Sequence, residues 1–215
     1  MVLGVVGKKL GMTQVFDDDG LVVPVTVVKV EPLTVTQLKT KEKEGYDAVQ
    51  LGTEPTKKRR LTRPELMHLE KNNLPAFKLL KEFRVDNIND YQIGQKIDLS
   101  IFSDVIKVDV TAKSIGKGFQ GCIKRHNAHR GPMSHGSKSH RITGSIGAGT
   151  TPSRVYKGHA MPGRMGAEKV TISKLKVVKI DSERNLILIK GSVPGHEGTI
   201  VTIKPSRTKW NYRSN

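Results

Sequence analysis

The feature that most constrains this chain is a long internal stretch without a single carboxylate side chain. Between Asp109 and Glu168 the sequence contains ten Lys or Arg residues, five His residues and no Asp or Glu. The stretch is rich in glycine, and its few apolar residues follow neither helical nor strand spacing. It cannot bury enough apolar surface to offset the entropy of ordering its backbone, so we expect residues 113–167 to form a long, non-globular basic arm.

So much positive charge repels itself unless a polyanion lies along the arm. The phosphate backbone of a nucleic acid is the commonest polyanion that a basic protein meets. The chain has 215 residues and a formal net charge of +17, and the cations of the arm account for over half of that excess. We therefore predict that the arm orders only on nucleic acid. A merely solvated basic surface is the alternative, but Asp and Glu would then interrupt it, as they do elsewhere in the chain.

Val-rich segments separated by turns flank the arm on both sides. Before it, we expect antiparallel strands at residues 2–6, 12–16, 21–30, 34–38, 46–52 and 106–112. After it, we expect a strand at 170–180, a hairpin turn at 181–185 and strands at 186–189 and 199–203. Pro24 indicates a sheet edge or a bulge, which is how barrel-like sheets bend. The arm is thus an internal excursion between two strands.

Residues 55–98 differ in character and predict a small α+β insertion. The block opens with the basic run 57–60, and Pro64 then suits the first turn of a helix with Leu66 and Leu69 on its apolar face. Residues 77–83 fit either a helix or a strand. The basic run is either a second phosphate contact or a solvated loop, and both remain open. The predicted organisation is barrel strands at 1–54, 99–112 and 168–215, the insertion at 55–98 and the arm at 113–167.

Two patterns in the arm resemble a cofactor loop and a metal or catalytic site, but the neighbouring residues do not support either function. Residues 116–121 have the spacing of a dinucleotide-binding loop, but the next residues are poor in helix formers and no acidic residue follows until Glu168. The five histidines lack the packed frame and the carboxylate partners of a zinc or catalytic site. We predict no catalytic residue, no metal and no cofactor, and we expect the glycines to let the backbone approach RNA.

Other sequence features narrow the class of protein further. The single cysteine, Cys122, excludes an internal disulfide and is expected to be an inert small side chain. No run of 18 apolar residues exists, and the N-terminal residues lack the layout of a signal peptide. We expect a soluble protein that stays where it is made, with no membrane and no small-molecule substrate.

The residues that we expect to contact RNA are the cationic, imidazole and hydroxyl side chains of the arm, together with one tyrosine. They are Lys113, Lys117, Lys124, Arg125, His126, His129, Arg130, Ser134, His135, Lys138, His140, Arg141, Arg154, Tyr156, Lys157, His159 and Arg164. Tyr156 is expected to stack on a base, and Phe119 to pack at the root of the arm. A flexible basic excursion suits a large folded RNA better than the grooves of DNA.

One set of spacings resembles a known family. The residues that carry it are Phe102, Asp109, Ala112, Ser114, Gly116, Lys117, Gly118, Gly121 and Arg125. Their joint pattern resembles that of the ribosomal protein L3 family in its bacterial and organellar form. Further matching segments at 7–13, 130–137, 144–147, 161–166 and 181–190 extend the resemblance over essentially the whole chain.

The resemblance implies a mainly β fold: a β-barrel of the translation-protein type with a small α+β insertion, on the outer surface of the large ribosomal subunit. The arm would run inward through 23S-type rRNA toward the peptidyl transferase centre. The inner loop nearest that centre would comprise Gly147, Ala148, Gly149, Thr150, Thr151 and Pro152.

The same resemblance implies a structural role rather than an enzymatic one. Such a protein binds large-subunit rRNA directly, helps to nucleate subunit assembly and has neighbours such as ribosomal proteins L14 and L19. The sequence is similar to cyanobacterial and plastid members, so we expect a ribosome in bacterial cytoplasm or plastid stroma. The alternatives are a free RNA chaperone or general nucleic-acid-binding protein and, less favoured by the residues, a glycine-loop cofactor enzyme.

Overall fold

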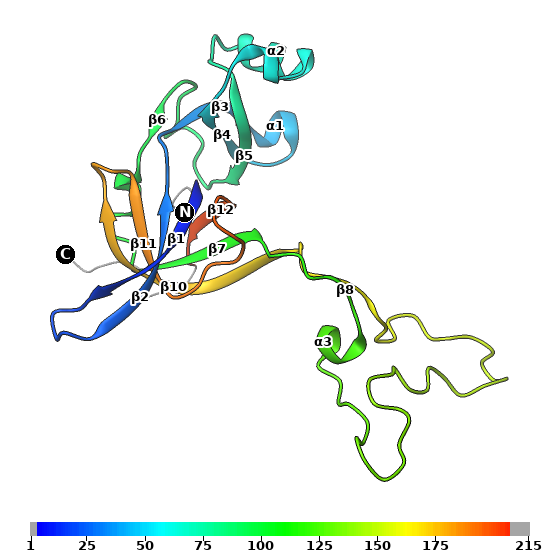
Figure 1. Cartoon of the computed structure of the whole chain (residues 1–215). Helices are drawn as coiled ribbons and strands as arrows, with labels where there is room; N and C mark the ends of the chain where they lie inside the picture. The colour runs from blue at the N-terminus through cyan, green and yellow to red at the C-terminus, as the bar shows by residue number, and fades with distance from the viewer. Residues whose placement is uncertain (1–3, 207–215) are drawn as a thin grey trace. The chain divides into compact units, whose positions relative to one another are not determined.

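The computed structural model describes residues 4–206 of the chain. The chain divides into two compact units: Met1–Lys113 with Lys169–Asn215, and Ser114–Glu168. We call the first the barrel unit and the second the basic unit. The chain leaves the barrel unit at the end of strand β7 and re-enters it at the start of strand β10, as the colours of Figure 1 allow the reader to follow.

Six strands of the barrel unit close into a barrel in the order β1-β12-β7-β10-β11-β2. They are β1 (Val5–Phe16), β2 (Val22–Lys29), β7 (Lys107–Lys113), β10 (Lys169–Asp181), β11 (Leu186–Lys190) and β12 (Ile200–Pro205). All six neighbouring pairs are antiparallel. Closure gives every strand a neighbour on each side, although residues 12–16 of β1 and 22–24 of β2 extend beyond those neighbours and pair only within their own hairpin.

The first two expected strands are one strand in the structure. Strand β1 covers both, because its ladder with β2 resumes after a bulge between Lys9 and Gly11. Val2 and Leu3 of the expected strand lie outside the described residues.

Strand β2 as a whole is not an edge strand, but the expected sheet edge is present locally at Pro24, where residues 22–24 pair only with β1. The bulge lies in β1 and not at Pro24. Pro24 is tolerated because the ladder of β2 with β11 ends at Val25 and Lys190, so no ladder bond to β11 is required of it. Its carbonyl still accepts a hydrogen bond from the N–H of Gly191 at 2.9 Å.

A second, four-stranded sheet has the order β5-β4-β3-β6 and is also antiparallel. Its strands are β3 (Leu33–Lys39), β4 (Ala48–Pro55), β5 (Phe77–Arg84) and β6 (Lys96–Ile97). Residues 34–38 and 48–52, expected in the barrel, lie in this sheet, and residues 46–47 of the expected strand precede β4. Strand periodicity reports which faces are buried and not which neighbour a strand pairs with, so the two sheets look alike in sequence.

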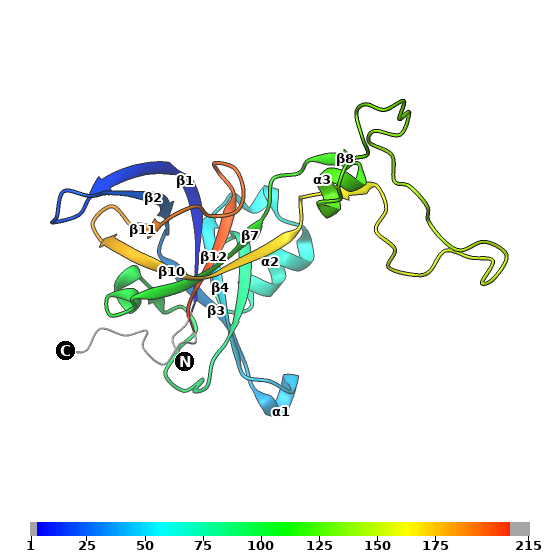
Figure 2. The same ribbon diagram turned by 90° about the horizontal axis from the view of Figure 1, so that it is seen from below.

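Short helices connect the strands of the second sheet (Figure 2). Helix α1 (Lys41–Glu44) joins β3 to β4, and a 3-10 turn (Lys58–Arg60) and helix α2 (Arg63–Glu70) join β4 to β5. The expected helix is present, with Leu69 buried and Leu66 half-buried. The carboxylate of Glu65 accepts hydrogen bonds from the N–H and the hydroxyl of Thr62, which fixes where the helix begins. The ambiguous segment 77–83 is strand β5.

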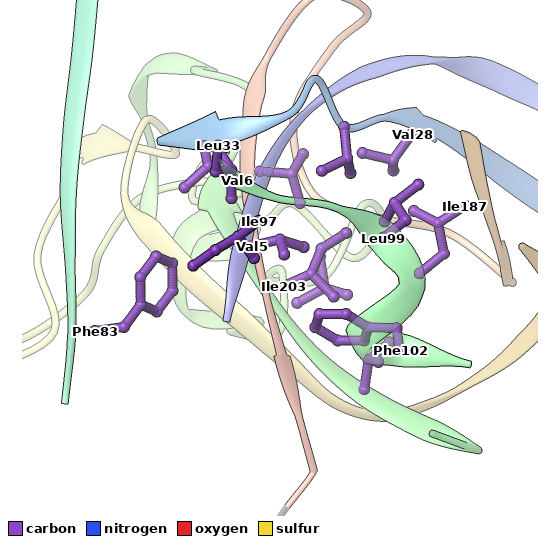
Figure 3. Packing of buried hydrophobic residues seen from close by; sticks show 14 of the residues in the cluster. Val5, Val6, Val28, Leu33, Phe83, Ile97, Leu99, Phe102, Ile187 and Ile203 are labelled. Atoms are coloured by element: carbon purple, nitrogen blue, oxygen red, sulfur yellow. The ribbon is translucent and has the colours of Figure 1, made fainter. Parts of the chain in front are cut away.

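The two sheets of the barrel unit share one apolar core. Figure 3 shows Val5, Val28, Ile187 and Ile203 from the barrel strands in one cluster with Leu99 and Phe102. Leu99 and Phe102 come from a 3-10 turn (Leu99–Phe102), and the cluster continues through Leu33, Phe83 and Ile97 of the second sheet. Full burial of one such side chain is worth about 1.5–3 kcal/mol, so this cluster supplies most of the driving force for folding.

The basic unit contains little regular structure. Strands β8 (Gly118–Gln120) and β9 (Gly163–Met165) pair with each other, and helix α3 (Cys122–His126) follows β8. Between α3 and β9 the chain follows irregular loops, which Figure 1 shows in green and yellow-green. The chain is therefore mainly β, as predicted. Among residues 4–206, none of the helices has the length and apolar character needed to cross a membrane.

Candidate nucleic-acid interface

The two ends of the basic unit are held together by backbone contacts. The N–H of Ser114 donates to the carbonyl of Glu168 at 2.8 Å, and the N–H of Lys117 donates to the carbonyl of Met165 at 2.9 Å. Gly166 has a φ of +72°, and a Cβ added to it would lie 2.2 Å from the carbonyl oxygen of Ile115. Only glycine fits such a close approach of two backbones, so the start and end of the unit form one narrow stem.

Helix α3 fastens the returning chain. The Sγ of Cys122 donates to the carbonyl of Ala160 at 3.4 Å, and a guanidinium nitrogen of Arg125 donates to the carbonyl of Met161 at 2.7 Å. Nε2 of His126 lies 3.0 Å from the same oxygen of Met161. Cys122, expected to be an inert small side chain, is buried here and also serves as a structural anchor. Arg125 and His126 support the unit as well as carrying charge or donors for a ligand.

A second anchor pinches the loop that follows α3. The N–H of Gly131 donates to the carbonyl of His140 at 2.8 Å, and Nδ1 of His140 lies 2.9 Å from the carbonyl of Pro132. A Cβ added to Gly131 would lie 2.0 Å from the carbonyl oxygen of Ser139, so the pinch needs glycine at this position. Because Gly131 and His140 are hydrogen-bonded, their sequence neighbours Arg130 and Arg141 are held at the same end of the loop.

The predicted inner loop lies on an open turn. Every residue from 141 to 151 is exposed. The N–H of Ser153 donates to the carbonyl of Gly149 at 3.2 Å, and the Ser153 hydroxyl donates to the carbonyl of Thr150. Gly149 has a φ of +120°, and no protein atom lies within 4 Å of the position of an added Cβ. The turn is closed by its own hydrogen bonds, and its outer surface is free for a ligand.

Tyr156 lies close to a cation. The Arg154 guanidinium carbon is 5.7 Å from the centroid of the Tyr156 ring, within the range of a cation–π contact. The tyrosine is exposed, so its ring can still pack on a flat group such as a base.

Charge in the basic unit is almost entirely of one sign. The unit has nine Lys or Arg residues against one carboxylate, Glu168, and eight of the nine cations are exposed. Arg125 is half-buried, and the remaining predicted contact Lys113 lies exposed at the end of β7 in the barrel unit. Among the predicted non-cationic contacts, only His140 is half-buried, and the others are exposed. Within the described residues of the basic unit, no cation forms a salt bridge.

Two expectations for this unit are corrected. Phe119 does not pack: it is 77% exposed and pairs across the β8–β9 ribbon with Arg164, because an isolated two-stranded ribbon has no second layer to cover either face. A helix, α3, does follow residues 116–121, although none was expected. It spans five residues, and the acidic residue that would hold a ribose is still absent from the sequence, so the dinucleotide interpretation is no stronger.

Some of the residues that hold the unit together were not predicted from the sequence. Cys122, Gly131 and Gly166 act through buried sulfur or close backbone contact, and only the abundance of glycine hinted at this. The histidines are spread along the unit. Among residues 4–206, no group of three or more His, Cys, Asp or Glu could hold a metal ion. The arrangement offers exposed cations, ring nitrogens, hydroxyls and backbone, which together suit a polyanion with crevices.

Comparison with known proteins points in one direction. A family model described as Ribosomal protein L3 matches residues 82–186. The chain is 53% identical over 207 residues to large ribosomal subunit protein uL3 of Nostoc punctiforme, which covers 96% of this chain and 99% of that protein. It is 54% identical to uL3 of Synechococcus sp. (strain JA-3-3Ab), covering 99% and 100%. It is 50% identical to protein uL3c of Phaeodactylum tricornutum, covering 96% and 100%.

Proposed function

The chain belongs to the ribosomal protein L3 family, and from this premise we propose that it is a structural constituent of the large ribosomal subunit that binds 23S-type rRNA through its basic unit. Its relatives are ribosomal proteins and not enzymes. They are cyanobacterial and plastid proteins, so the ribosome that holds this chain is one of bacterial cytoplasm or of a plastid. The observation that carries the proposal is the set of nine cations with a single carboxylate in the basic unit.

Unpaired exposed cations favour a polyanionic ligand for an electrostatic reason. Each Lys or Arg that meets a phosphate displaces a condensed counterion, and the released ions supply much of the binding free energy. The basic unit offers eight exposed cations and lacks apolar packing that would hold it in one shape. A folded RNA has crevices in which such loops can lie between phosphate strands, whereas the DNA grooves favour a rigid helix or ribbon.

The finer parts of the proposal come from the family resemblance and from the loop geometry. We place the inner loop, residues 147–152, nearest the peptidyl transferase centre, because it is uncharged, small and fully open on its outer side at Gly149. The closed six-stranded barrel supports a translation-protein-type fold, which we propose lies on the outer surface of the subunit. Early rRNA binding that nucleates assembly, with ribosomal proteins L14 and L19 as neighbours, completes the proposed role.

The first test measures how the affinity for an rRNA fragment depends on salt. In the triple variant Arg130→Ala, Lys138→Ala, Arg141→Ala, we expect the slope of log affinity against log salt to become shallower by about 2 to 3, or 0.7–0.9 per lost phosphate contact. The matched control is Lys43→Ala, Lys179→Ala, Lys190→Ala, which removes equal charge from exposed positions of the barrel unit. If the slope of log affinity against log salt is equal in the two triple variants, the basic unit is not the main RNA contact.

A second experiment distinguishes a ribosomal protein from a free RNA chaperone. The full chain should sediment with large subunits through high salt, because many contacts and a fitted shape hold it there. A general chaperone would bind bulk RNA and dissociate as salt rises, since its affinity rests on counterion release alone. Loss of the chain from large subunits at moderate salt would favour the chaperone.

The inner-loop role is tested with Gly149→Asp in purified ribosomes. We expect normal incorporation into subunits but altered peptide-bond formation or altered response to inhibitors of that centre, because a carboxylate would be placed near phosphate. Gly149→Asn is the matched control, since it has the same shape and the same positive φ without the charge. Normal activity and inhibitor response in Gly149→Asp would mean that the loop is a spacer.

A further inference from the structure

The barrel unit carries a basic groove of its own, where strands β10, β7 and β12 meet the start of β1 and the end of β5. Its volume is about 270 Å³. We call it the threonine groove, and the residues that line it are Gly4, Lys81, Phe83, Arg84, Asp109, Thr111, Lys169, Thr171, Thr202, Lys204 and Pro205. All of these residues belong to the barrel unit.

Strand register builds the wall of the threonine groove. Thr111 of β7 lies directly across from Thr171 of β10 on one side and from Thr202 of β12 on the other. The three hydroxyl-bearing residues therefore form a row across three strands, and the hydroxyls of Thr111 and Thr171 lie 2.8 Å apart. A hydroxyl can both donate and accept, so the row can give donors to an anion without itself adding charge.

The second sheet closes the other side. Phe83 of β5 is buried, and a Cβ added to Gly4 would lie 2.4 Å from its ring, so Gly4 and Phe83 pack tightly together. Nζ of Lys204 lies 5.4 Å from the centroid of the same ring. Because Phe83 is covered, the threonine groove offers no exposed aromatic face on which a base could stack.

Charge in the threonine groove is strongly positive. Three lysines and one arginine line it against one carboxylate, that of Asp109. Oδ1 of Asp109 accepts a hydrogen bond from the backbone N–H of Lys174 at 2.8 Å. This carboxylate oxygen is therefore already hydrogen-bonded to β10. Within residues 4–206, neither Lys81 nor Lys169 forms an ion pair with a carboxylate.

We infer that the threonine groove binds backbone phosphate of an RNA strand, which gives the barrel unit an RNA contact independent of the basic unit. This inference rests on the proposed function, since it takes rRNA as the partner. Ammonium groups together with hydroxyl donors are the usual contacts to phosphate oxygens. With no base-stacking surface, the groove fixes the position of an RNA strand and does not read its sequence. Lys169, which lines the groove, pairs with Lys113 at the end of the ladder of β7 with β10, so one side of the groove lies where the chain leaves the barrel unit.

The experiment uses the full chain and an rRNA fragment. In Lys81→Ala, Lys169→Ala we expect the salt slope to become shallower by about 1.4 to 1.8 and the affinity near 100 mM salt to fall roughly tenfold. The matched control, Lys43→Ala, Lys190→Ala, removes the same charge from exposed lysines outside the groove and should change both quantities much less. Thermal unfolding of both variants should match the unmodified chain, because all four lysines are exposed.

A direct readout comes from acetylating the lysines of the unmodified chain with and without the RNA. We expect the RNA to protect Lys81 and Lys169 and to leave Lys43 and Lys190 reactive. Thr111→Val keeps the shape of the strand and removes the central hydroxyl, and it should weaken RNA binding without changing the salt slope.

Each alternative outcome is distinct. Unprotected Lys81 and Lys169, with equal slopes in the two double variants, would overturn the inference and leave the proposed function intact. Protection of the two lysines by a poly-glutamate peptide but not by RNA would also overturn it, in favour of an acidic protein partner. If the unmodified chain does not bind the rRNA fragment at all, the proposed function fails, and the inference fails with it.

Discussion

Several charged side chains of the barrel unit form ion pairs within the protein, whereas none of the described cations of the basic unit does. Lys39 and Glu82 lie 2.6 Å apart, and Lys78 and Glu54 lie 2.9 Å apart, with further pairs at the surface of the same unit. The basic unit has one carboxylate for nine cations and, among its described residues, no salt bridge. The barrel unit therefore neutralises part of its positive charge within the protein, whereas the basic unit neutralises almost none.

Apolar burial divides the chain in the same way. The barrel unit has a continuous core drawn from both sheets, whereas the basic unit buries a single residue, Cys122. This difference shows that folding stability and ligand binding can lie in different parts of one polypeptide. The core supplies a fold that persists without the ligand, and the exposed unit keeps its cations and backbone free for RNA at the cost of order when it is alone.

Hydrogen exchange of the isolated protein should show the largest difference. Amides of the core strands, such as those of Val110 and Ile203, should exchange only on global unfolding, which typically requires about 5–15 kcal/mol. Amides of residues 127–160 should exchange nearly as fast as in an unfolded chain, because no apolar face holds these loops. Gly131, whose N–H donates to His140, is the sharpest site to follow. Slow exchange across residues 130–150 would contradict the idea that this unit orders on RNA.

Truncation of a core residue should be the next largest effect. Phe102 is fully buried, and Phe102→Ala should lower the free energy of unfolding by about 3–5 kcal/mol through lost burial and a residual cavity. Met133→Ala, in an exposed loop of the basic unit, should change it by less than about 0.5 kcal/mol. Denaturant titration of both variants measures this, and comparable losses would show that the basic unit also carries folding free energy.

A smaller effect is expected at a lysine built into the barrel. Nζ of Lys9 is buried and donates to the carbonyls of Val193 at 2.9 Å and Gly195 at 2.8 Å. Lys9→Met keeps the apolar stem but leaves both carbonyls without this donor, so stability should fall by about 1–3 kcal/mol. The preceding lysine, Lys8, is exposed and serves as the control. A Lys8→Met variant as unstable as Lys9→Met would show that the loss is not due to the buried hydrogen bonds.

The smallest effect concerns a partly exposed acidic side chain. The carboxylate of Glu82 accepts from Lys39 and from the hydroxyl of Tyr46, and the hydrogen bond from Lys39 is the main cause that holds the pKa of Glu82 below its usual value. A lowered folded-state pKa contributes stability above the unfolded pKa of about 4.3, and that stability is lost as pH falls through the folded value.

The variant Glu82→Gln should therefore be less stable than the unmodified chain at pH 7, by less than the loss at Lys9. The difference should shrink as pH falls below about 4. Thermal unfolding at a series of pH values measures it. A difference that persists unchanged at pH 3 would mean that packing around Tyr46, and not the ionised carboxylate, accounts for it.

Much of the fold could be predicted from sequence because its signals are local. Alternating Val-rich runs predicted most strands, and the Pro64 and Leu69 pattern predicted helix α2. The assignment of 34–38 and 46–52 to the barrel was wrong, since it depends on which strands are neighbours. In the basic unit, the exposure of the cations was foreseeable from their density, but the anchors at Cys122 and Gly131 were not.

By itself, the sequence determined that this chain is mainly β, that a carboxylate-free stretch interrupts it and that this stretch cannot form a core. These properties follow from residue type, spacing and charge, which each segment carries without its neighbours. Only the tertiary structure decided that six strands close into a barrel while four form a separate sheet. It alone brought Thr171, Thr111 and Thr202 into one row beside Lys81. Those groups lie far apart along the chain, and their meeting depends on strand register, which is set by the packing of the whole unit.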